Sequence, residues 1–257
     1  RLVPFRRVIA APDRHSGGTS WGSVGPVVRA DMAKLHVGLP HLEGSLSDYA
    51  ERFDTIELGF DAGAIPKPAT LRGWRRDVGP SFAVSLRLPK PVSDLSMTKE
   101  MDRALDESVA AATALEARAI VLVTSSEVRP TQATFEKLRA VVARLPRPGV
   151  LLCWEPRGIW ERPEITSAAR DLGLLPVVDA LPGGPVAYTR LRSLGNTAKV
   201  GPRAIEKIAK GVETKREAWI IVEHAGSAKR VRTEVGQALA RTIPSQRPQP
   251  PSSAIST

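Results

Sequence analysis

The stretch Val150-Leu-Leu-Cys-Trp-Glu-Pro-Arg-Gly-Ile-Trp160 decides the fold class of this chain. It opens on an apolar run, which is typical of a parallel strand buried on both faces. The run stops at Glu155, and Arg157 follows two residues later. Side chains at the carboxyl ends of parallel strands are the ones that meet a ligand, and a structural ion pair is the alternative. The ends of the other strands discriminate between these two interpretations.

The same pattern of short apolar runs and longer amphipathic segments continues along the chain. Strands are expected at residues 35–39, 55–58, 82–88, 119–124, 149–154, 174–178, 187–191 and 219–222. Helices are expected at residues 45–52, 69–78, 99–117, 131–145, 163–172, 202–215 and 227–241. This alternation predicts an α/β fold, a (β/α)8 barrel of the TIM type rather than a doubly wound sheet of five or six strands. The few residues between Asp179 and Ala187 leave no room for a helix between strands six and seven.

The composition divides the chain into one domain and two flanking segments. Residues 1–33 contain Gly, Pro, Ser and Arg without periodicity and are predicted to be a disordered or non-native extension. Residues 34–243 are expected to form the single barrel domain. Residues 244–257 are rich in Pro, Ser and Gln and are predicted to be a disordered tail.

Cysteine usage and hydropathy limit the class of protein. The single Cys153 excludes a disulfide framework and a thiolate metal cluster, which suits a reducing compartment. No apolar run approaches the ~20 residues that cross a bilayer, and the amino terminus lacks an apolar signal core. We therefore expect a cytoplasmic protein with no membrane partner.

The formal net charge of +10 raises the question of a nucleic-acid partner. Basic residues are spread over the whole chain and are interspersed with acidic ones in the expected helices, for example at 207–217. This distribution favours an ordinary basic surface over a dedicated binding patch. Nucleic-acid binding remains an alternative.

Nearly every expected strand turns polar at its carboxyl end. The residues concerned are Glu57, Arg87, Glu155, Arg157, Asp179, Arg190, Arg192, Glu223 and His224. In a barrel they would converge on one face and form a pocket of mixed charge, which is typical of a functional site. Arginine guanidinium groups favour phosphate or carboxylate ligands, because their planar donors bind two oxygens at once.

The sequence predicts a role for each of these residues and for the nearby Trp160. Glu57, Glu155 and Asp179 are the candidates for general acid and base. The candidates for ligand binding are Arg87, Arg157, Trp160, Arg190, Arg192, Glu223 and His224. A divalent metal would suit some of these side chains, but no compact ligand motif is present, so no metal ligand is assigned and the cofactor stays open. A network of ion pairs without a ligand is the remaining alternative.

Several short motifs follow one another between residues 36 and 231. They are Tyr49-Ala-Glu-Arg-Phe-Asp-Thr-Ile-Glu57, Ile65-Pro66 with Pro68 and Trp74, Phe82-Ala-Val-Ser-Leu-Arg-Leu-Pro89, Trp154-Glu-Pro-Arg157 with Trp160, Val178-Asp179, and Tyr188-Thr-Arg-Leu-Arg192. In this order they resemble the YecE-like family, known as domain of unknown function 72. The resemblance implies a TIM-type barrel with a short connection between strands six and seven. It also implies that Glu57, Glu155, Arg157, Asp179 and Arg190 occupy the family's polar positions, with Arg87 where a Lys is usual.

The chain departs from this family at several strand ends, so it resembles a divergent member. Gly59-Phe-Asp-Ala-Gly63 replaces the usual Asn-Ser-Thr-Phe-Tyr, and Leu39-Pro-His41 replaces Ser-Gly-Trp. Arg192 takes the place of a His, and Glu223 and His224 that of paired Asn residues. The family has no agreed reaction, and these changes imply that any shared activity is altered or lost.

The sequence thus predicts a TIM-barrel protein that binds a small anionic ligand at the carboxyl ends of its strands. Whether it is an enzyme stays open, and a hydrolase is the enzyme class considered. The alternatives are a nucleic-acid-binding protein or metal-assisted phosphodiesterase, and a scaffold without catalytic activity. The sequence predicts no oligomeric state.

Overall fold

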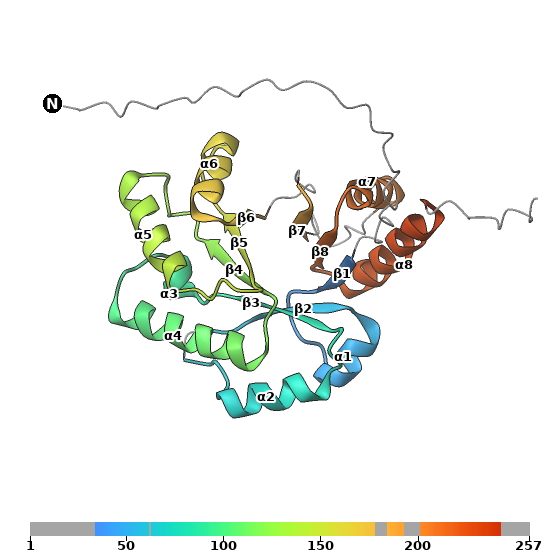
Figure 1. The fold of residues 1–257 in the computed structure, drawn as a ribbon, viewed down its shortest axis with the longest axis horizontal. Helices are drawn as coiled ribbons and strands as arrows, with labels where there is room; N and C mark the ends of the chain where they lie inside the picture. Colours follow the sequence, from blue (N-terminus) through green and yellow to red (C-terminus); the bar gives the residue numbers. More distant parts are fainter. Residues whose placement is uncertain (1–33, 62, 178–183, 193–200, 243–257) are drawn as a thin grey trace, which may run out of the picture. The chain divides into compact units, whose positions relative to one another are not determined.

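A computed structural model of the chain describes residues 34–61, 63–177, 184–192 and 201–242 (Figure 1). The eight strands are β1 (Lys34–Leu39), β2 (Thr55–Gly59), β3 (Ala83–Arg87), β4 (Ala119–Thr124), β5 (Leu151–Pro156), β6 (Leu175–Pro176), β7 (Val186–Leu191) and β8 (Glu217–Val222). The helices are α1 (Leu46–Arg52), α2 (Pro68–Asp77), α3 (Lys90–Ser93), α4 (Lys99–Ala114), α5 (Gln132–Ala143), α6 (Arg162–Leu172), α7 (Pro202–Glu213) and α8 (Ala225–Thr242). The predictions for 1–33 and 244–257 lie outside the described residues.

All strand pairs among the described residues are parallel, and the strands follow the order β6-β5-β4-β3-β2-β1-β8-β7. Strands that are consecutive in the chain are neighbours, and the first strand pairs with the last. This is the order of a (β/α)8 barrel, which confirms the predicted TIM-type fold. In the part of the chain that the structure describes, no backbone pairing joins β6 to β7, so the barrel is nearly closed.

Strand β6 is the shortest strand and is shorter than predicted. It pairs with β5 only at Leu175 and Pro176, opposite Cys153 and Trp154. Pro176 has no backbone N–H to donate, which limits the length of a ladder at this position. No described residue between β6 and β7 is helical, which agrees with the predicted absence of a helix there.

Helix α3 has no counterpart in the sequence-based prediction. It is a single turn of four residues after β3, and it begins at Pro89-Lys90-Pro91. Proline favours the first turn of a helix, since its φ angle is already helical and its missing N–H is not needed there. A helix this short shows no periodicity of apolar residues, and the pattern therefore did not reveal it.

Three of the described helices begin at hydroxyl side chains that cap free N–H groups. Ser45, Thr98 and Thr131 accept hydrogen bonds from the backbone N–H three residues later, at the starts of α1, α4 and α5. Such caps satisfy donors that have no partner within the helix. They fix the residue at which each of these helices starts.

The interior of the barrel is filled by side chains rather than open. Small and branched residues from alternating strand positions, among them Ala83, Val121 and Ile221, pack around Tyr188 and Trp219. The rings of Tyr188 and Trp219 stack with centroids 5.9 Å apart. A Cβ atom at Gly38 would lie 1.8 Å from the carbonyl oxygen of Thr55, which explains the glycine where β1 meets β2.

No helix among the described residues is long and apolar enough to cross a membrane.

Candidate functional site

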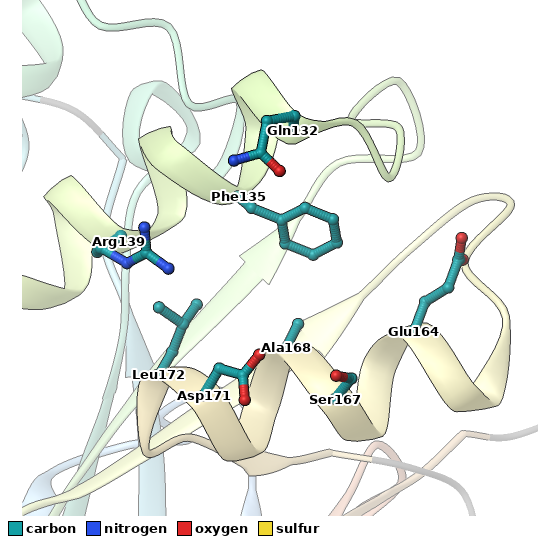
Figure 2. Close-up of a pocket in the computed structure, with 8 residues that line it drawn as sticks. All are labelled: Gln132, Phe135, Arg139, Glu164, Ser167, Ala168, Asp171 and Leu172. Carbon is teal, nitrogen blue, oxygen red and sulfur yellow. The ribbon is translucent and has the colours of Figure 1, made fainter. Parts of the chain in front are cut away.

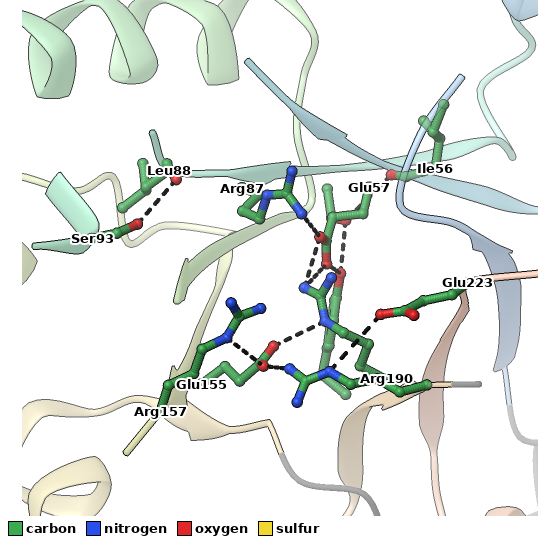
Figure 3. Close-up of polar contacts among 12 residues, drawn as sticks. Ile56, Glu57, Arg87, Leu88, Ser93, Glu155, Arg157, Arg190 and Glu223 are labelled. Atoms are coloured by element: carbon green, nitrogen blue, oxygen red, sulfur yellow. Dashed lines mark hydrogen bonds and ion pairs between the residues drawn. The ribbon is translucent and has the colours of Figure 1, made fainter. Parts of the chain in front are cut away.

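Seven charged side chains meet at the carboxyl ends of the strands. We call them the strand-end cluster, which consists of Glu57, Arg87, Glu155, Arg157, Arg190, Arg192 and Glu223. Figure 3 shows the ion pairs that connect them into one network. The residues come from β2, β3, β5, β7 and β8 or directly follow these strands. The structure thus brings together side chains that sequence reasoning placed at separate strand ends.

Glu57 is the most deeply buried member of the strand-end cluster, with no exposed side-chain surface. The Nη2 atom of Arg190 donates to both of its carboxylate oxygens at 2.7 Å. Tyr188 donates its hydroxyl proton to Oε2 at 2.8 Å, and Nη1 of Arg87 lies 3.8 Å from Oε1. A buried carboxylate is stable only when it is paired and hydrogen-bonded, and these contacts meet that requirement.

A second layer of polar residues lies directly beneath the strand-end cluster. The hydroxyl groups of Tyr188 and Ser85 are 2.9 Å apart, and Ser85 Oγ also lies 3.3 Å from the carbonyl oxygen of Ile56. Burial and the nearby charge of Glu57 raise the pKa of Tyr188 well above its usual value, so its hydroxyl remains a donor.

Sequence reasoning did not assign Tyr188 and Ser85 to the site. The signal was available, because side chains two residues apart in a strand point to the same face. Tyr188 precedes Arg190 by two residues on β7, and Ser85 precedes Arg87 by two residues on β3.

Glu155 joins three arginines. Its Oε1 atom lies 3.5 Å from Nε of Arg157 and also pairs with Nη2 of Arg192. Its Oε2 atom lies 2.9 Å from Nε of Arg190, yet the N–H is not directed at that oxygen, so the two buried atoms form an ion pair without an aligned hydrogen bond. Glu223 approaches the network more loosely, with Oε1 3.9 Å from Nε of Arg192.

The arginines of the strand-end cluster differ in exposure. Arg190 is 4% exposed, whereas Arg157, Arg192 and Arg87 are 48%, 41% and 37% exposed. Four arginines face three glutamates, so the described cluster carries an excess of positive charge. The surface that this group offers to a ligand is therefore cationic, while its carboxylates Glu57 and Glu155 lie below.

Gly59, at the end of β2, allows Arg87 to lie where it does. A Cβ atom at this position would be 2.4 Å from the Nη2 atom of the Arg87 guanidinium group. A larger residue would displace Arg87 from Glu57. The glycine belongs to the segment in which the sequence departs from the family pattern.

Two predicted ligand-binding residues have other contacts, and one predicted acid or base lies outside the described residues. The indole N–H of Trp160 donates to the carbonyl oxygen of Val128 at 2.9 Å, and its ring packs against Trp154 with centroids 4.9 Å apart. Nδ1 of His224 accepts from the backbone N–H of Ser227 at 3.3 Å, at the start of α8. Asp179 lies outside the described residues.

The described residues contain no group of three or more His, Cys, Asp or Glu side chains that are placed to hold a metal ion. The glutamates of the strand-end cluster are surrounded by guanidinium groups instead, which favour anions over cations. The chemistry that this arrangement offers is anion binding, with Glu155 as the carboxylate nearest the exposed arginines.

Two cavities lie elsewhere on the molecule. One of about 350 Å³ lies between α5 and α6 and is lined by Phe135, Arg139, Glu164, Asp171 and their neighbours (Figure 2). A second of about 310 Å³ lies near the amino ends of β5 and β8 beside Arg118, Arg147 and Glu217. Neither is lined by a residue of the strand-end cluster.

Solved structures with the same fold include two proteins described as DUF72 family members. The one from Enterococcus faecalis superposes with a TM-score of 0.67 at 12% identity, over 81% of this chain and 98% of that one. The one from Thermotoga maritima has a TM-score of 0.59 at 14% identity, over 81% and 98% of the two chains. A D-psicose 3-epimerase superposes with a TM-score of 0.53 at 15% identity, over 81% and 97%. At these identities the likeness shows the barrel fold alone.

Sequence comparison gives the family. No curated protein matches the chain significantly. The profile of the family described as "Protein of unknown function DUF72" matches residues 33–243, which include every described strand and helix. The chain therefore belongs to the DUF72 family, for which YecE-like is an equivalent name.

Proposed function

We propose that the strand-end cluster binds a small oxyanion, the phosphate or carboxylate group of a larger ligand. One observation carries this proposal: Arg157 and Arg192 are 48% and 41% exposed, and both guanidinium groups converge on the same oxygen of the buried Glu155. Two guanidinium groups that share one carboxylate oxygen are spaced to share an oxygen of an incoming anion.

The roles within the strand-end cluster follow from exposure. Arg157 and Arg192 bind the anion, and Arg87 adds a third partly exposed cation on the side of Glu57. Arg190 is a positioning residue, because it is 4% exposed and its guanidinium group already forms ion pairs with Glu57 and Glu155. This assignment differs from the sequence-based one, in which Arg190 bound the ligand. If the protein is a hydrolase, Glu155 is its candidate acid or base, since Glu57 is held by Arg190 and Tyr188.

Ligand-dependent thermal unfolding tests the proposal. The panel contains phosphate, citrate, nucleotides and sugar phosphates, the last because sugar epimerases share the fold. A ligand at about 100 times its Kd should raise Tm by roughly 5 to 10 °C for a chain of this size. Arg157→Ala should remove most of this shift. Arg139→Ala is the matched control, because Arg139 is exposed on α5, away from the strand ends.

Either of two results would overturn the proposal. If no anion in the panel stabilises the chain, or if Arg157→Ala responds like the parent protein, the strand-end cluster is not an anion site. A catalytic test follows any positive result: release of phosphate or of an alcohol from the stabilising ligand, with Glu155→Gln as the comparison.

Nucleic-acid binding is a second candidate, because the formal net charge is +10 and the sequence pI is about 10.2. Phosphate contacts release counterions, so this function predicts affinity for a DNA or RNA oligonucleotide that falls steeply with salt. A flat response between low and physiological salt would exclude it. Arg157→Ala discriminates further: a loss of affinity places the nucleic acid at the strand-end cluster.

A further inference from the structure

We propose that Glu155 occupies the position of the ligand in the free protein, so that the strand-end cluster inhibits itself until an oxyanion displaces this carboxylate. The inference rests on the proposed function, since it concerns how the same arginines meet their ligand. It assigns Glu155 two arrangements, one turned toward Arg157 and Arg192 and one turned toward Arg190.

The first arrangement is the one observed. Oε1 of Glu155 pairs with Arg157 and with Arg192, the two most exposed arginines of the strand-end cluster. A carboxylate oxygen between two guanidinium groups presents the same chemistry as one oxygen of a phosphate or sulfate. An oxyanion from solution must therefore compete with Glu155 for both arginines.

The other oxygen of Glu155 indicates the second arrangement. Oε2 of Glu155 and Nε of Arg190 are both buried and 2.9 Å apart, but neither makes an aligned hydrogen bond. Buried polar atoms nearly always have such a bond, so this donor and acceptor are held just short of one. A small rotation of the Glu155 carboxylate would align them, and the pairing of Oε1 with Arg157 and Arg192 opposes that rotation.

The charges remain balanced when an anion takes over Arg157 and Arg192. Glu155 keeps its ion pair with Arg190, and Arg190 keeps both oxygens of Glu57. Arg87 stays beside Glu57, and Glu223 stays beside Arg192. No buried charge is left without a partner, so the change avoids the large free-energy cost of an unpaired buried charge. The anion therefore replaces one carboxylate oxygen and allows the hydrogen bond between Arg190 and Glu155 to form.

The test compares sulfate binding by the full chain and by its Glu155→Gln variant. Sulfate is used because its charge does not change near neutral pH. Glutamine cannot form the ion pairs that compete with the ligand, so the Kd for sulfate in isothermal titration calorimetry should fall by roughly tenfold. Glu127→Gln is the matched control: it removes an equal charge from an exposed residue after β4, and its Kd should stay within about twofold of the parent value.

A second measurement on the unaltered protein does not depend on the variant folding. Sulfate should shift the Nε–H proton resonance of Arg190 downfield as its hydrogen bond to Glu155 forms, the resonance being assigned by its loss in Arg190→Lys. If the parent protein binds sulfate but Glu155→Gln binds it no more tightly and the resonance does not move, the inference fails while the anion site stands. If neither protein binds sulfate or any other oxyanion, the proposed function fails with it.

Discussion

Nη2 of Arg190 lies 2.7 Å from both carboxylate oxygens of Glu57, in the interior of the barrel. The same guanidinium group is 2.9 Å from Glu155 through its Nε atom. One buried cation thus pairs with two buried carboxylates that come from β2 and β5.

Replacement of Arg190 should therefore destabilise the fold strongly. Arg190→Ala leaves two buried carboxylates without their shared cation, and we expect the free energy of unfolding to drop by about 3–5 kcal/mol. Arg190→Lys should lose less, because the ammonium group keeps the charge. Urea unfolding at neutral pH measures both values, and a loss below about 1 kcal/mol for the alanine variant would contradict the assigned positioning role.

Tyr188→Phe removes one hydroxyl group from between Glu57 and Ser85. Both partners lose a hydrogen bond in a buried setting, so we expect a loss of about 1–3 kcal/mol in the free energy of unfolding. A double-mutant cycle with Ser85→Ala separates the two contacts. Additive losses would show that the Tyr188 and Ser85 hydroxyl groups act independently, whereas contact at 2.9 Å predicts coupling of about 0.5 kcal/mol or more.

The chain has two tyrosines, Tyr49 and Tyr188, and neither should ionise in the folded state near pH 10. Burial raises the pKa of both above the usual value of about 10. The unfolded state releases these protons at lower pH than the folded state, so the stability of the fold decreases as the pH rises above about 10. Absorbance at about 295 nm should change only together with unfolding followed by circular dichroism. A phenolate signal in the folded protein near pH 10 would contradict this expectation.

Glu217 should make the fold more sensitive to acid. Its hydrogen bond with His36 lowers its pKa, and Arg118 contributes a smaller effect in the same direction. A lowered carboxyl pKa stabilises the fold above the usual value of about 4.3, and this stabilisation is lost as the pH falls through the lower, folded-state value.

Glu217→Gln should accordingly flatten the decline in stability between neutral and acidic pH. Urea midpoints at a series of pH values measure it, with Glu206→Gln as a control because that side chain is 68% exposed. Parallel curves for the parent and the Glu217 variant would show that the pair with His36 does not contribute.

Sequence patterns predicted the barrel because each strand is a short apolar run and each run recurs at a regular interval. They predicted the polar strand ends for the same reason: Glu155 and Arg190 interrupt apolar runs and must lie at or near their ends. What they could not give is the pairing. Arg190 lies within β7 and is buried against two carboxylates, whereas Arg157 follows the last residue of β5 and is half exposed. Which carboxylates Arg190 meets depends on how β2, β5 and β7 face one another across the barrel, which no local pattern records.

The sequence patterns also failed to predict helix α3 and the length of strand β6. Helix α3 has four residues, which are too few to show helical periodicity. The sixth strand was predicted at 174–178 from its apolar residues, but Pro176 has no backbone N–H to donate, and β6 is shorter. Trp160 was predicted to bind the ligand, whereas its ring packs against Trp154 and its indole N–H donates to the carbonyl oxygen of Val128.

Ion pairs of the strand-end cluster lie where the described strands β6 and β7 are not joined by backbone pairing. Arg190 and Arg192, at the end of β7, reach Glu155 on β5, across the edge where the described backbone hydrogen bonds stop. Ion pairs between side chains therefore connect β7 to β5 on the side of the barrel where no described backbone hydrogen bond joins β6 to β7. We expect an anion that displaces Glu155 from Arg192 to remove one of the two ion pairs between these strands. If the proposed displacement takes place, ligand binding at the strand-end cluster would also weaken the connection between β5 and β7.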